Sequence, residues 1–175
     1  TETLYARWEA NSYKIEFNPN GGSGSIPSQT MVYDTVTELY SILYVKPGYT
    51  FLGWDTNPTA TEAQYSDGAN ITNLTTENEV TITLYAIWKK TITVEYDANG
   101  GEGAPSTSTG TIYNNEENVN ITLSNTKPTK EGNIFYGWTD EQNSTEVKYQ
   151  PGGTYLFTDS IVLYAVWGTD NYKLT

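Results

Sequence analysis

The chain has 175 residues, among them 21 acidic and 9 basic ones, a formal net charge of −12, and neither cysteine nor histidine. The missing Cys and His exclude a disulfide framework, thiol nucleophiles and the usual zinc sites. The acidic balance repels phosphate backbones, so we expect no nucleic acid partner. The sequence contains no run of about 18 apolar residues, so it also predicts no membrane insertion.

A tandem repeat sets the organisation of the chain. The string Leu-Tyr-Ala-x-Trp occurs three times and ends at Trp8, Trp88 and Trp167, which are 80 and 79 residues apart. A period of this length predicts two units, each with a core of its own. We expect a piece of a longer array with these parts: 1–10, the closing strand of a preceding repeat; 11–89, repeat unit 1; 90–168, repeat unit 2; and 169–175, the start of a following repeat.

Each predicted unit opens with a strand and a turn. In 13–17 and in 92–96 apolar side chains alternate with polar ones, which predicts a strand with one buried face. Asn20-Gly21-Gly22 and Asn99-Gly100-Gly101 follow these strands. Because Asn and Gly tolerate positive φ, we expect a tight turn or bulged loop there. A phosphate-binding loop would also need a Lys-Ser/Thr ending and a following helix pattern, which the sequence lacks.

The middle of the two units differs most. Residues 119–123 alternate apolar and polar side chains, which predicts a strand. Residues 36–45 are rich in Leu, Tyr and Ile. They are compatible with an irregular strand and with one or two helical turns, and both interpretations stay open.

Each unit continues with an aromatic block and a closing strand. The block spans 48–54 in the first unit and 132–138 in the second. The closing strands, 82–88 and 161–167, are apolar on both faces, which predicts a central strand or one whose second face is covered. The residues that we assign to the repeated structural motif are Gly21, Gly22, Phe51, Gly53, Trp54, Tyr85, Trp88, Gly100, Gly101, Phe135, Gly137, Trp138, Tyr164 and Trp167.

The order of these motifs resembles a known family. An aromatic strand ending in Asn-Gly-Gly, a Gly-Tyr-Thr-Phe-x-Gly-Trp block and a Leu-Tyr-Ala-x-Trp ending occur in this order twice, with a departure at Asn133-Ile134 in the second block. This combination is similar to the Listeria–Bacteroides repeat, also called the internalin-type B repeat, over almost the whole chain. The resemblance implies a mostly β chain of small β-grasp-like units, ubiquitin-like or mucin-binding-like, in an elongated tandem array. It also implies a place on bacterial surface and secreted proteins, some of them virulence-associated, and it brings no catalytic residues.

The aromatic residues are the first candidates for a binding site. The five tryptophans could form a sugar-stacking platform, but the small residues beside them in each unit favour packing in the core; they are Trp8, Trp54, Trp88, Trp138 and Trp167. Tyr85 and Tyr164 lie on the outward faces of the closing strands. They are candidates for a binding surface, with simple coverage of the sheet as the alternative.

The acidic residues do not form a recognisable site. Glu16 and Glu95 occupy matching positions, but each stands alone on its strand, whereas a glycosidase needs two acids. Asp55 and Asp67 lie in loops without the spacing of a calcium site. We therefore predict that the chain is not an enzyme, that it needs no cofactor, and that it has no catalytic, cofactor-binding or metal residues.

These observations favour a non-enzymatic stalk or spacer in an extracellular, cell-wall-associated bacterial protein. Its expected partners are the neighbouring repeats of the same chain. The alternative is an adhesion module that binds a host surface protein or glycan, through an exposed sheet edge or through the outward tyrosines.

Overall fold

The computed structural model describes residues 2–169, which form eleven strands and no helix. The chain divides into two compact units: unit 1 ends at Lys90 and adds Tyr113–Asn115, and unit 2 runs from Thr91 to Ile112 and resumes at Glu116. The strands are β1 (Ser12–Asn18), β2 (Gln29–Val32), β3 (Thr37–Glu38), β4 (Thr50–Asp55), β5 (Asn70–Ile71), β6 (Thr81–Asp97), β7 (Ser108–Tyr113), β8 (Val119–Thr122), β9 (Ile134–Thr139), β10 (Thr154–Phe157) and β11 (Ile161–Gly168). A mostly β chain is confirmed, whereas the β-grasp-like assignment stays a prediction.

The sheet of unit 1 is built around the first part of β6. This strand pairs in parallel with β1, where Lys14 lies opposite Thr81, and antiparallel with β4, where Trp54 lies opposite Ala86. On its other side β1 pairs antiparallel with β2. The closing strand thus has a neighbour on both sides, so its prediction as a central strand is confirmed.

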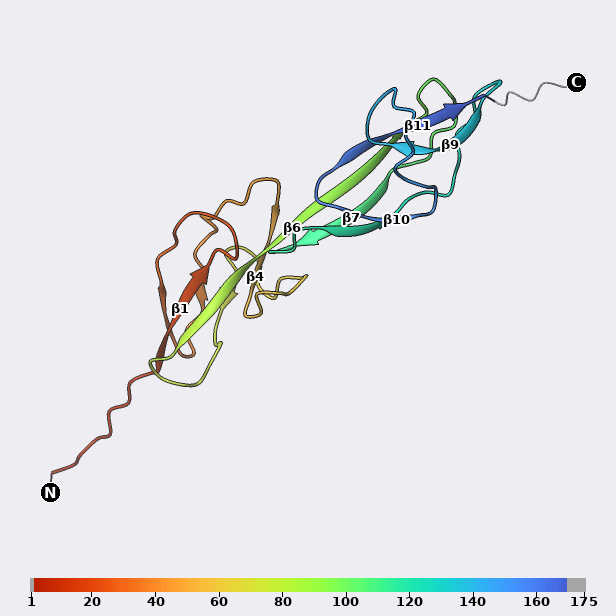
Figure 1. Cartoon of the computed structure of the whole chain (residues 1–175). Coiled ribbons are helices and arrows are strands. Elements are labelled where there is room, and N and C mark those ends of the chain that lie inside the picture. Colours follow the sequence, from red (N-terminus) through yellow and green to blue (C-terminus); the bar gives the residue numbers. More distant parts are fainter. Residues whose placement is uncertain (1, 170–175) are drawn as a thin grey trace, which may run out of the picture. The chain divides into compact units, whose positions relative to one another are not determined.

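Unit 2 repeats this arrangement around β11. This strand pairs in parallel with the second part of β6, where Ile161 lies opposite Val94, and antiparallel with β9, where Ala165 lies opposite Trp138. In Figure 1 β11 runs beside β9 and the end of β6, and β7 supplies a further strand to β6. The equivalent pairings place the same motif residues at the same positions of each sheet.

One strand serves both units. The sequence predicts two separate strands here, the closing strand of the first unit and the opening strand of the second. In the structure β6 continues through Lys89, Lys90 and Thr91 as a strand of 17 residues. These three residues include no Gly or Pro to end the strand. Two predicted strands are therefore one.

The middle of each unit forms a small ribbon. In unit 1, β3 pairs with β5, and the rest of 36–45 is irregular apart from a bridge between Val45 and Ser23. The interpretation of this segment as helical turns is thereby excluded. In unit 2, β8 pairs with β10, which confirms the strand predicted at 119–123.

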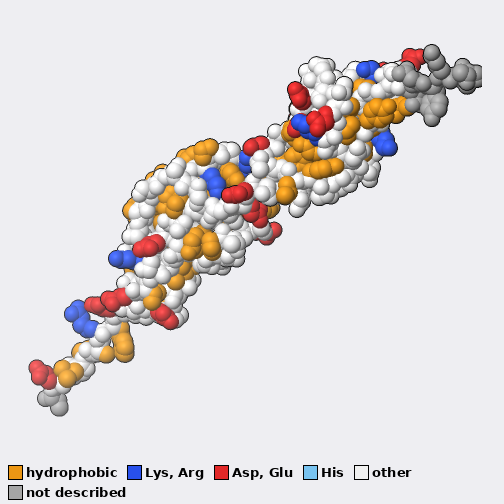
Figure 2. Space-filling view, in the orientation of Figure 1, with side chains coloured by type: hydrophobic (Ala, Val, Ile, Leu, Met, Phe, Trp, Pro, Cys, Tyr) orange, Lys and Arg blue, Asp and Glu red, His pale blue; other side chains and the backbone are white. Residues whose placement is uncertain are grey.

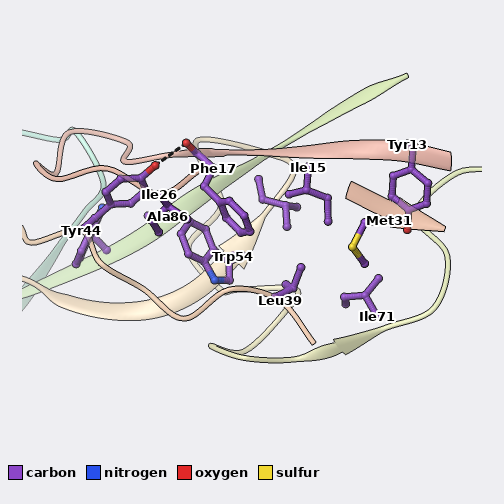
Figure 3. Close-up of a cluster of buried hydrophobic side chains, with 12 residues drawn as sticks. Tyr13, Ile15, Phe17, Ile26, Met31, Leu39, Tyr44, Trp54, Ile71 and Ala86 are labelled. Atoms are coloured by element: carbon purple, nitrogen blue, oxygen red, sulfur yellow. Dashed lines mark hydrogen bonds between the residues drawn. The ribbon is translucent and has the colours of Figure 1, made fainter. Parts of the chain in front are cut away.

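A tryptophan lies at the centre of the core of unit 1. Trp54 is fully buried, and its ring meets those of Phe17, Tyr44 and Phe51 at centroid distances of 4.9, 6.1 and 5.1 Å. Figure 3 shows Trp54 between Phe17 and Leu39, with the Tyr44 hydroxyl donating a 2.6 Å hydrogen bond to the Phe17 carbonyl. Paired rings add to the stabilisation that their buried area provides. The buried face predicted for 13–17 is confirmed.

Unit 2 has the equivalent core around Trp138. Its ring lies 4.9 Å from that of Tyr96 and 5.0 Å from that of Phe135. The other buried apolar residues of the unit include Ile92, Val94, Ile112, Ile121, Leu123, Phe157, Leu163, Ala165 and Val166. Each unit therefore buries its own aromatic centre.

The first residues of the chain resemble the closing strands in sequence but do not form a strand. Residues 2–11 lie outside any strand, and Trp8 is 91% exposed. The expectation that Trp8 packs in a core is therefore wrong here, because no described strand lies beside it. Of the predicted segment 169–175, residues 170–175 lie outside the described part of the chain.

Candidate functional site

The Asn-Gly-Gly segments form the predicted turns. Asn20 and Gly21 have φ of 46° and 86°, and Asn99 and Gly100 have φ of 48° and 83°. The second glycine of each turn lies under a tryptophan: a Cβ on Gly101 would fall 2.5 Å from the Trp167 ring. Positive φ and close ring packing thus explain why these residue types occur there.

Each turn is fastened to the closing strand by side-chain hydrogen bonds. The Trp88 indole donates to the Pro19 carbonyl at 2.8 Å, and the Asn20 amide donates to the Ala86 carbonyl at 3.0 Å. In unit 2, Trp167 donates to Ala98 at 2.9 Å and Asn99 donates to Ala165 at 3.0 Å. The first and last motifs of the repeat therefore bind each other.

The aromatic block is shaped by its second glycine. Gly53 has φ of 137°, and a Cβ there would lie 2.3 Å from the Tyr65 carbonyl oxygen. This approach lets Trp54 and Tyr65 exchange two backbone hydrogen bonds, at 2.7 and 2.9 Å. Trp138 and Tyr149 make the same exchange, at 2.8 and 3.0 Å.

Three of the tryptophans are buried as the packing interpretation requires. Trp54 and Trp138 are 0% exposed and Trp88 is buried, so none of them offers a ring face for a sugar. The indole N–H groups of Trp54 and Trp138 have no hydrogen-bond acceptor among the described residues. Trp167 is only half-buried.

Trp167 lines a groove in unit 2, which we call the unit-2 groove. The groove has a volume of about 770 Å³; its lining residues are Gly100, Gly101, Glu102, Pro128, Thr129, Lys130, Glu131, Asn133, Phe135 and Trp167. The Lys130 ammonium lies 5.8 Å from the centre of the Trp167 ring and 3.4 Å from the Asn99 carbonyl oxygen. A cation, carboxylates and an aromatic face therefore meet in an open site.

Sequence reasoning missed this groove. Four of its residues, Gly100, Gly101, Phe135 and Trp167, are in the predicted motif, but only as packing residues. Lys130 has a partner at the equivalent place in unit 1, Lys46, and this repetition was a signal that could have pointed to the site. The walls come from three separate segments of the chain, so spacing alone could not assemble them.

The two candidate tyrosines are less prominent than predicted. Tyr85 and Tyr164 are half-buried, and Tyr85 lies between Asn18 of β1 and Asp55 of β4 in the centre of the sheet. More exposed tyrosines occur elsewhere, at Tyr40 (44%) and Tyr136 (49%). A role of Tyr85 and Tyr164 in binding stays a prediction.

The acids single out no reactive centre. Glu16 and Glu95 are exposed on their strands, Asp55 accepts the Asn57 amide at 2.8 Å, and Asp67 accepts the Ile42 amide at 2.8 Å. Within residues 2–169 no group of three Asp or Glu side chains is placed to hold a metal ion. Asp55, at the end of β4, and Asp67, in a loop, thus each accept a hydrogen bond from the backbone of an irregular segment.

Three groups with shifted pKa values fit this picture. Lys148 donates a 2.6 Å hydrogen bond to Asp140, which lowers the pKa of Asp140 and raises that of Lys148. Burial lowers the pKa of Lys46, whose ammonium donates to the carbonyl oxygens of Asn20 and Asn114. None of these shifts accompanies a nucleophile or a pair of carboxylates.

The visible surface is mostly uncharged and polar. In Figure 2 neutral polar groups and backbone cover most of the face shown, with acidic, basic and hydrophobic side chains in small separate groups. None of the described residues belongs to a helix long and apolar enough to cross a membrane.

The chain resembles longer bacterial proteins. It is 31% identical to a putative Gly-rich membrane protein of Evansella cellulosilytica, in a match that covers 99% of this chain and 19% of that protein. It is 32% identical to a putative membrane protein of the same organism, over 98% of this chain and 23% of that protein. The chain thus spans about a fifth of the length of these curated relatives.

A solved structure and a family model also match. The type 2 repeat of the mucus binding protein MUB from Lactobacillus reuteri has 13% sequence identity and a TM-score of 0.27, with 91% of this chain and 100% of that chain covered. The model of the Listeria-Bacteroides repeat domain matches residues 13–87 and 93–166. The chain therefore belongs to the Listeria-Bacteroides repeat domain family and contains two copies of the repeat.

Proposed function

We propose that this chain is a non-enzymatic spacer in an extracellular, cell-wall-associated bacterial protein, where it holds other domains away from the wall. The observation that best supports this proposal is that the residues repeated in both units have structural roles. Gly53 lets a loop pack closely against β4, Trp54 fills the core and Trp88 fastens the turn of unit 1, and Gly137, Trp138 and Trp167 do the same in unit 2. The residues that recur are thus those that make a unit fold.

The repeated polar groups support the same function. Asn20 and Asn99 bind backbone carbonyls of the closing strands, and Lys46 and Lys130 bind backbone carbonyls of the turns. A catalytic repeat would be expected to present side chains to a substrate, with perturbed titrating groups in a cleft. Here the recurring polar side chains stabilise the loops.

Small-angle X-ray scattering of the 175-residue chain tests the spacer function. A single compact globule of this length would have a radius of gyration of about 16 Å. A spacer requires two separated units, so we expect a clearly larger value and a distance distribution with two maxima. A compact, single-peaked distribution near 16 Å would contradict the proposal.

The second candidate function is adhesion. It is favoured by an apolar hollow on unit 1, of about 320 Å³, that is lined by Ile26, Pro27, Tyr40, Ser41 and Leu43. Tyr40 and Leu43 are exposed there, and contiguous exposed apolar groups often mark contact surfaces. The half-buried Tyr85 and Tyr164 are the other candidates for such contacts.

Binding to a panel of host glycans and matrix proteins tests adhesion. The variants are Tyr40→Ser with Leu43→Ser, and Tyr85→Thr with Tyr164→Thr, which keeps a residue suited to a strand. Saturable binding that one pair abolishes, in a protein that still melts cooperatively, would support adhesion through that surface. Absence of binding by the wild-type chain would leave the spacer function.

A further inference from the structure

Unit 1 contains a short turn from much later in the chain. Tyr113–Asn115 belongs to this compact unit, although the rest of β7 belongs to unit 2. Asn114 is buried and has φ of 48°, the left-handed conformation that Asn tolerates better than most residues. Such placement requires specific partners for its polar groups.

Asn114 is bound through its backbone and its side chain. Its amide donates to the Trp88 carbonyl at 3.0 Å, and its side-chain oxygen accepts the Trp88 amide at 3.0 Å. Its side-chain nitrogen donates to the Ala60 carbonyl at 2.7 Å. The turn therefore supplies hydrogen-bond partners for the amide and carbonyl of Trp88. The pairing of β6 with β1 ends before this residue, at Tyr85.

Lys46 and Asn20 complete the binding of the turn. The Lys46 ammonium donates to the Asn114 carbonyl and, at 3.4 Å, to the Asn115 side-chain oxygen. The Asn115 side-chain nitrogen donates to the Asn20 side-chain oxygen at 2.9 Å. Gly21 leaves room for Asn115, since a Cβ there would fall 2.1 Å from the Asn115 oxygen.

The described part of unit 2 has the equivalent set of groups, a Lys, an Asn, a Gly and a Trp, without a turn bound to them. Lys130 binds the Asn99 carbonyl at 3.4 Å, as Lys46 binds that of Asn20 at 3.4 Å. A Cβ on Gly100 would meet only the Lys130 side chain within 4 Å, and no part of another turn. Where Tyr113–Asn115 lies in unit 1, the described part of unit 2 has the unit-2 groove beside Trp167.

We propose that the unit-2 groove is a docking site for an Asn-Asn turn of another repeat of this family. The Lys130 ammonium binds the carbonyl of the first Asn, whose side chain bonds the backbone of Trp167. The second Asn binds the side chain of Asn99, and Gly100 gives it room. This surface goes beyond the spacer function, since it can bind a turn whether or not the chain separates other domains.

The chemistry of the groove favours this occupant over a sugar. The Trp167 ring is only half-buried, but Lys130 lies over it at 5.8 Å. Unit 1 shows that the same set of groups, a Lys, an Asn, a Gly and a Trp backbone, binds two asparagines. An uncharged turn also avoids repulsion by Glu102 and Glu131, which line the groove.

Nuclear magnetic resonance of the ¹⁵N-labelled 175-residue chain tests the proposal. The probe is a peptide with the sequence of residues 111–115, Thr-Ile-Tyr-Asn-Asn, to which a cysteine is added at each end so that a disulfide closes the ring. We expect saturable shifts of the amides of Gly100 and Gly101 and of the Trp167 indole. The equivalent groups of unit 1, Gly21, Gly22 and Trp88, are the internal control and should not shift, because the chain's own turn already lies beside Gly21 and is bonded to the Trp88 backbone.

Two variants and one altered probe sharpen the result. Lys130→Met should weaken binding by about tenfold, because it removes a charged hydrogen-bond donor. A chain with Asn114→Ala and Asn115→Ala should gain peptide-induced shifts at Trp88. The side chains that fasten the chain's own turn to unit 1 are then missing, so the peptide can take its place. A peptide with both asparagines changed to alanine should not bind.

Several results would overturn the proposal. They are the absence of shifts at millimolar peptide, equal shifts with the alanine peptide, and shifts of Trp88 and Trp167 alike in the unaltered chain. Saccharides that shift Gly101 and Trp167, without competition from the Asn-Asn peptide, would assign the groove to a glycan instead.

Discussion

Unit 1 and unit 2 place a tryptophan at the same motif position but surround it differently. Trp88 is buried and bonded through its backbone to Asn114, whereas Trp167 is half-buried beside an open groove. Both indoles still donate to the preceding turn, at 2.8 and 2.9 Å. The motif therefore determines how a unit folds, whereas the surroundings of its last tryptophan differ between the two units.

Substitution of the central tryptophans should give the largest loss of stability, and the loss should be similar in the two units. Trp54→Ala and Trp138→Ala each remove a fully buried ring, which typically costs about 3–5 kcal/mol. We expect each variant to unfold its own unit at lower denaturant. Urea unfolding followed at the amides of Gly21 and Gly100 reports the two units separately.

If either variant lowers the stability of both units together, the two cores are not independent and the prediction is wrong. Tyr5→Ser is the control, because this tyrosine is 84% exposed and its loss should leave both transitions almost unchanged.

The block glycines should differ between the units. A Cβ on Gly53 would meet the Tyr65 carbonyl at 2.3 Å, whereas one on Gly137 would meet the Val147 side chain at 2.5 Å and the Tyr149 carbonyl at 2.8 Å. Because a side chain can move more easily than backbone, Gly53→Ala should destabilise unit 1 more than Gly137→Ala destabilises unit 2. Chemical unfolding of both variants measures the difference.

Gly48→Ala provides the reference for this comparison. Gly48 has φ of 77° and open space at the Cβ position, so alanine there should cost only the backbone strain, roughly 1–2 kcal/mol. A cost of Gly53→Ala no larger than that of Gly48→Ala would show that the close approach to Tyr65 is unimportant.

Loss of the docked turn should lower the stability of unit 1 and leave that of unit 2 unchanged. Asn114→Ala leaves the Trp88 amide and the Ala60 carbonyl without their partner, at a cost of about 1–3 kcal/mol. We also expect faster hydrogen exchange of the Trp88 indole, toward that of Trp167. Exchange measured by NMR on both indoles is the readout.

Asn120→Ala is the matched control for this variant, since Asn120 is exposed on β8 and its loss should change stability by less than about 0.5 kcal/mol. Unchanged exchange of the Trp88 indole in Asn114→Ala would mean that the turn does not cause the difference between the two tryptophans.

The parts of the fold that sequence reasoning predicted depend on local pattern. Alternation identified the buried face of Tyr13, Ile15 and Phe17, and Asn20-Gly21 identified a turn, because each depends on neighbouring residues. The docked turn depends on contacts between residues as far apart as Asn115 and Asn20. A local alternation of apolar and polar residues cannot predict a contact between residues so far apart in the sequence.

Errors of sequence reasoning have similar causes. Trp8 repeats the motif, but its burial depends on strands that the described chain does not place beside it. The groove was missed because Gly101, Phe135 and Trp167 look like packing residues, and only the emptiness beside them makes a site. A repeated sequence thus predicts a common fold better than a common surface.

An ion pair that unit 2 has and unit 1 lacks gives the smallest predicted effect. Asp140 and Lys148 are partly exposed and 2.6 Å apart, and the position in unit 1 that corresponds to Asp140 is Thr56. The pKa of Asp140 is lowered on folding, so its contribution is present above the unfolded pKa of about 3.9 and is lost as pH falls through the folded value. The pKa of Lys148 is raised, so its contribution is present below about 10.4 and is lost as pH rises through the folded value.

Asp140→Asn should therefore reduce the free energy of unfolding of unit 2 slightly at neutral pH and hardly at all at pH 2 or pH 12. The expected reduction is small because the pair is exposed and screened by salt. Urea unfolding at the three pH values, followed at Gly100 for unit 2 and at Gly21 for unit 1, measures it. Since the ion pair lies in unit 2 alone, an equal change in the transition of unit 1 would contradict this origin of the pH dependence and show that the stabilities of the two units are coupled.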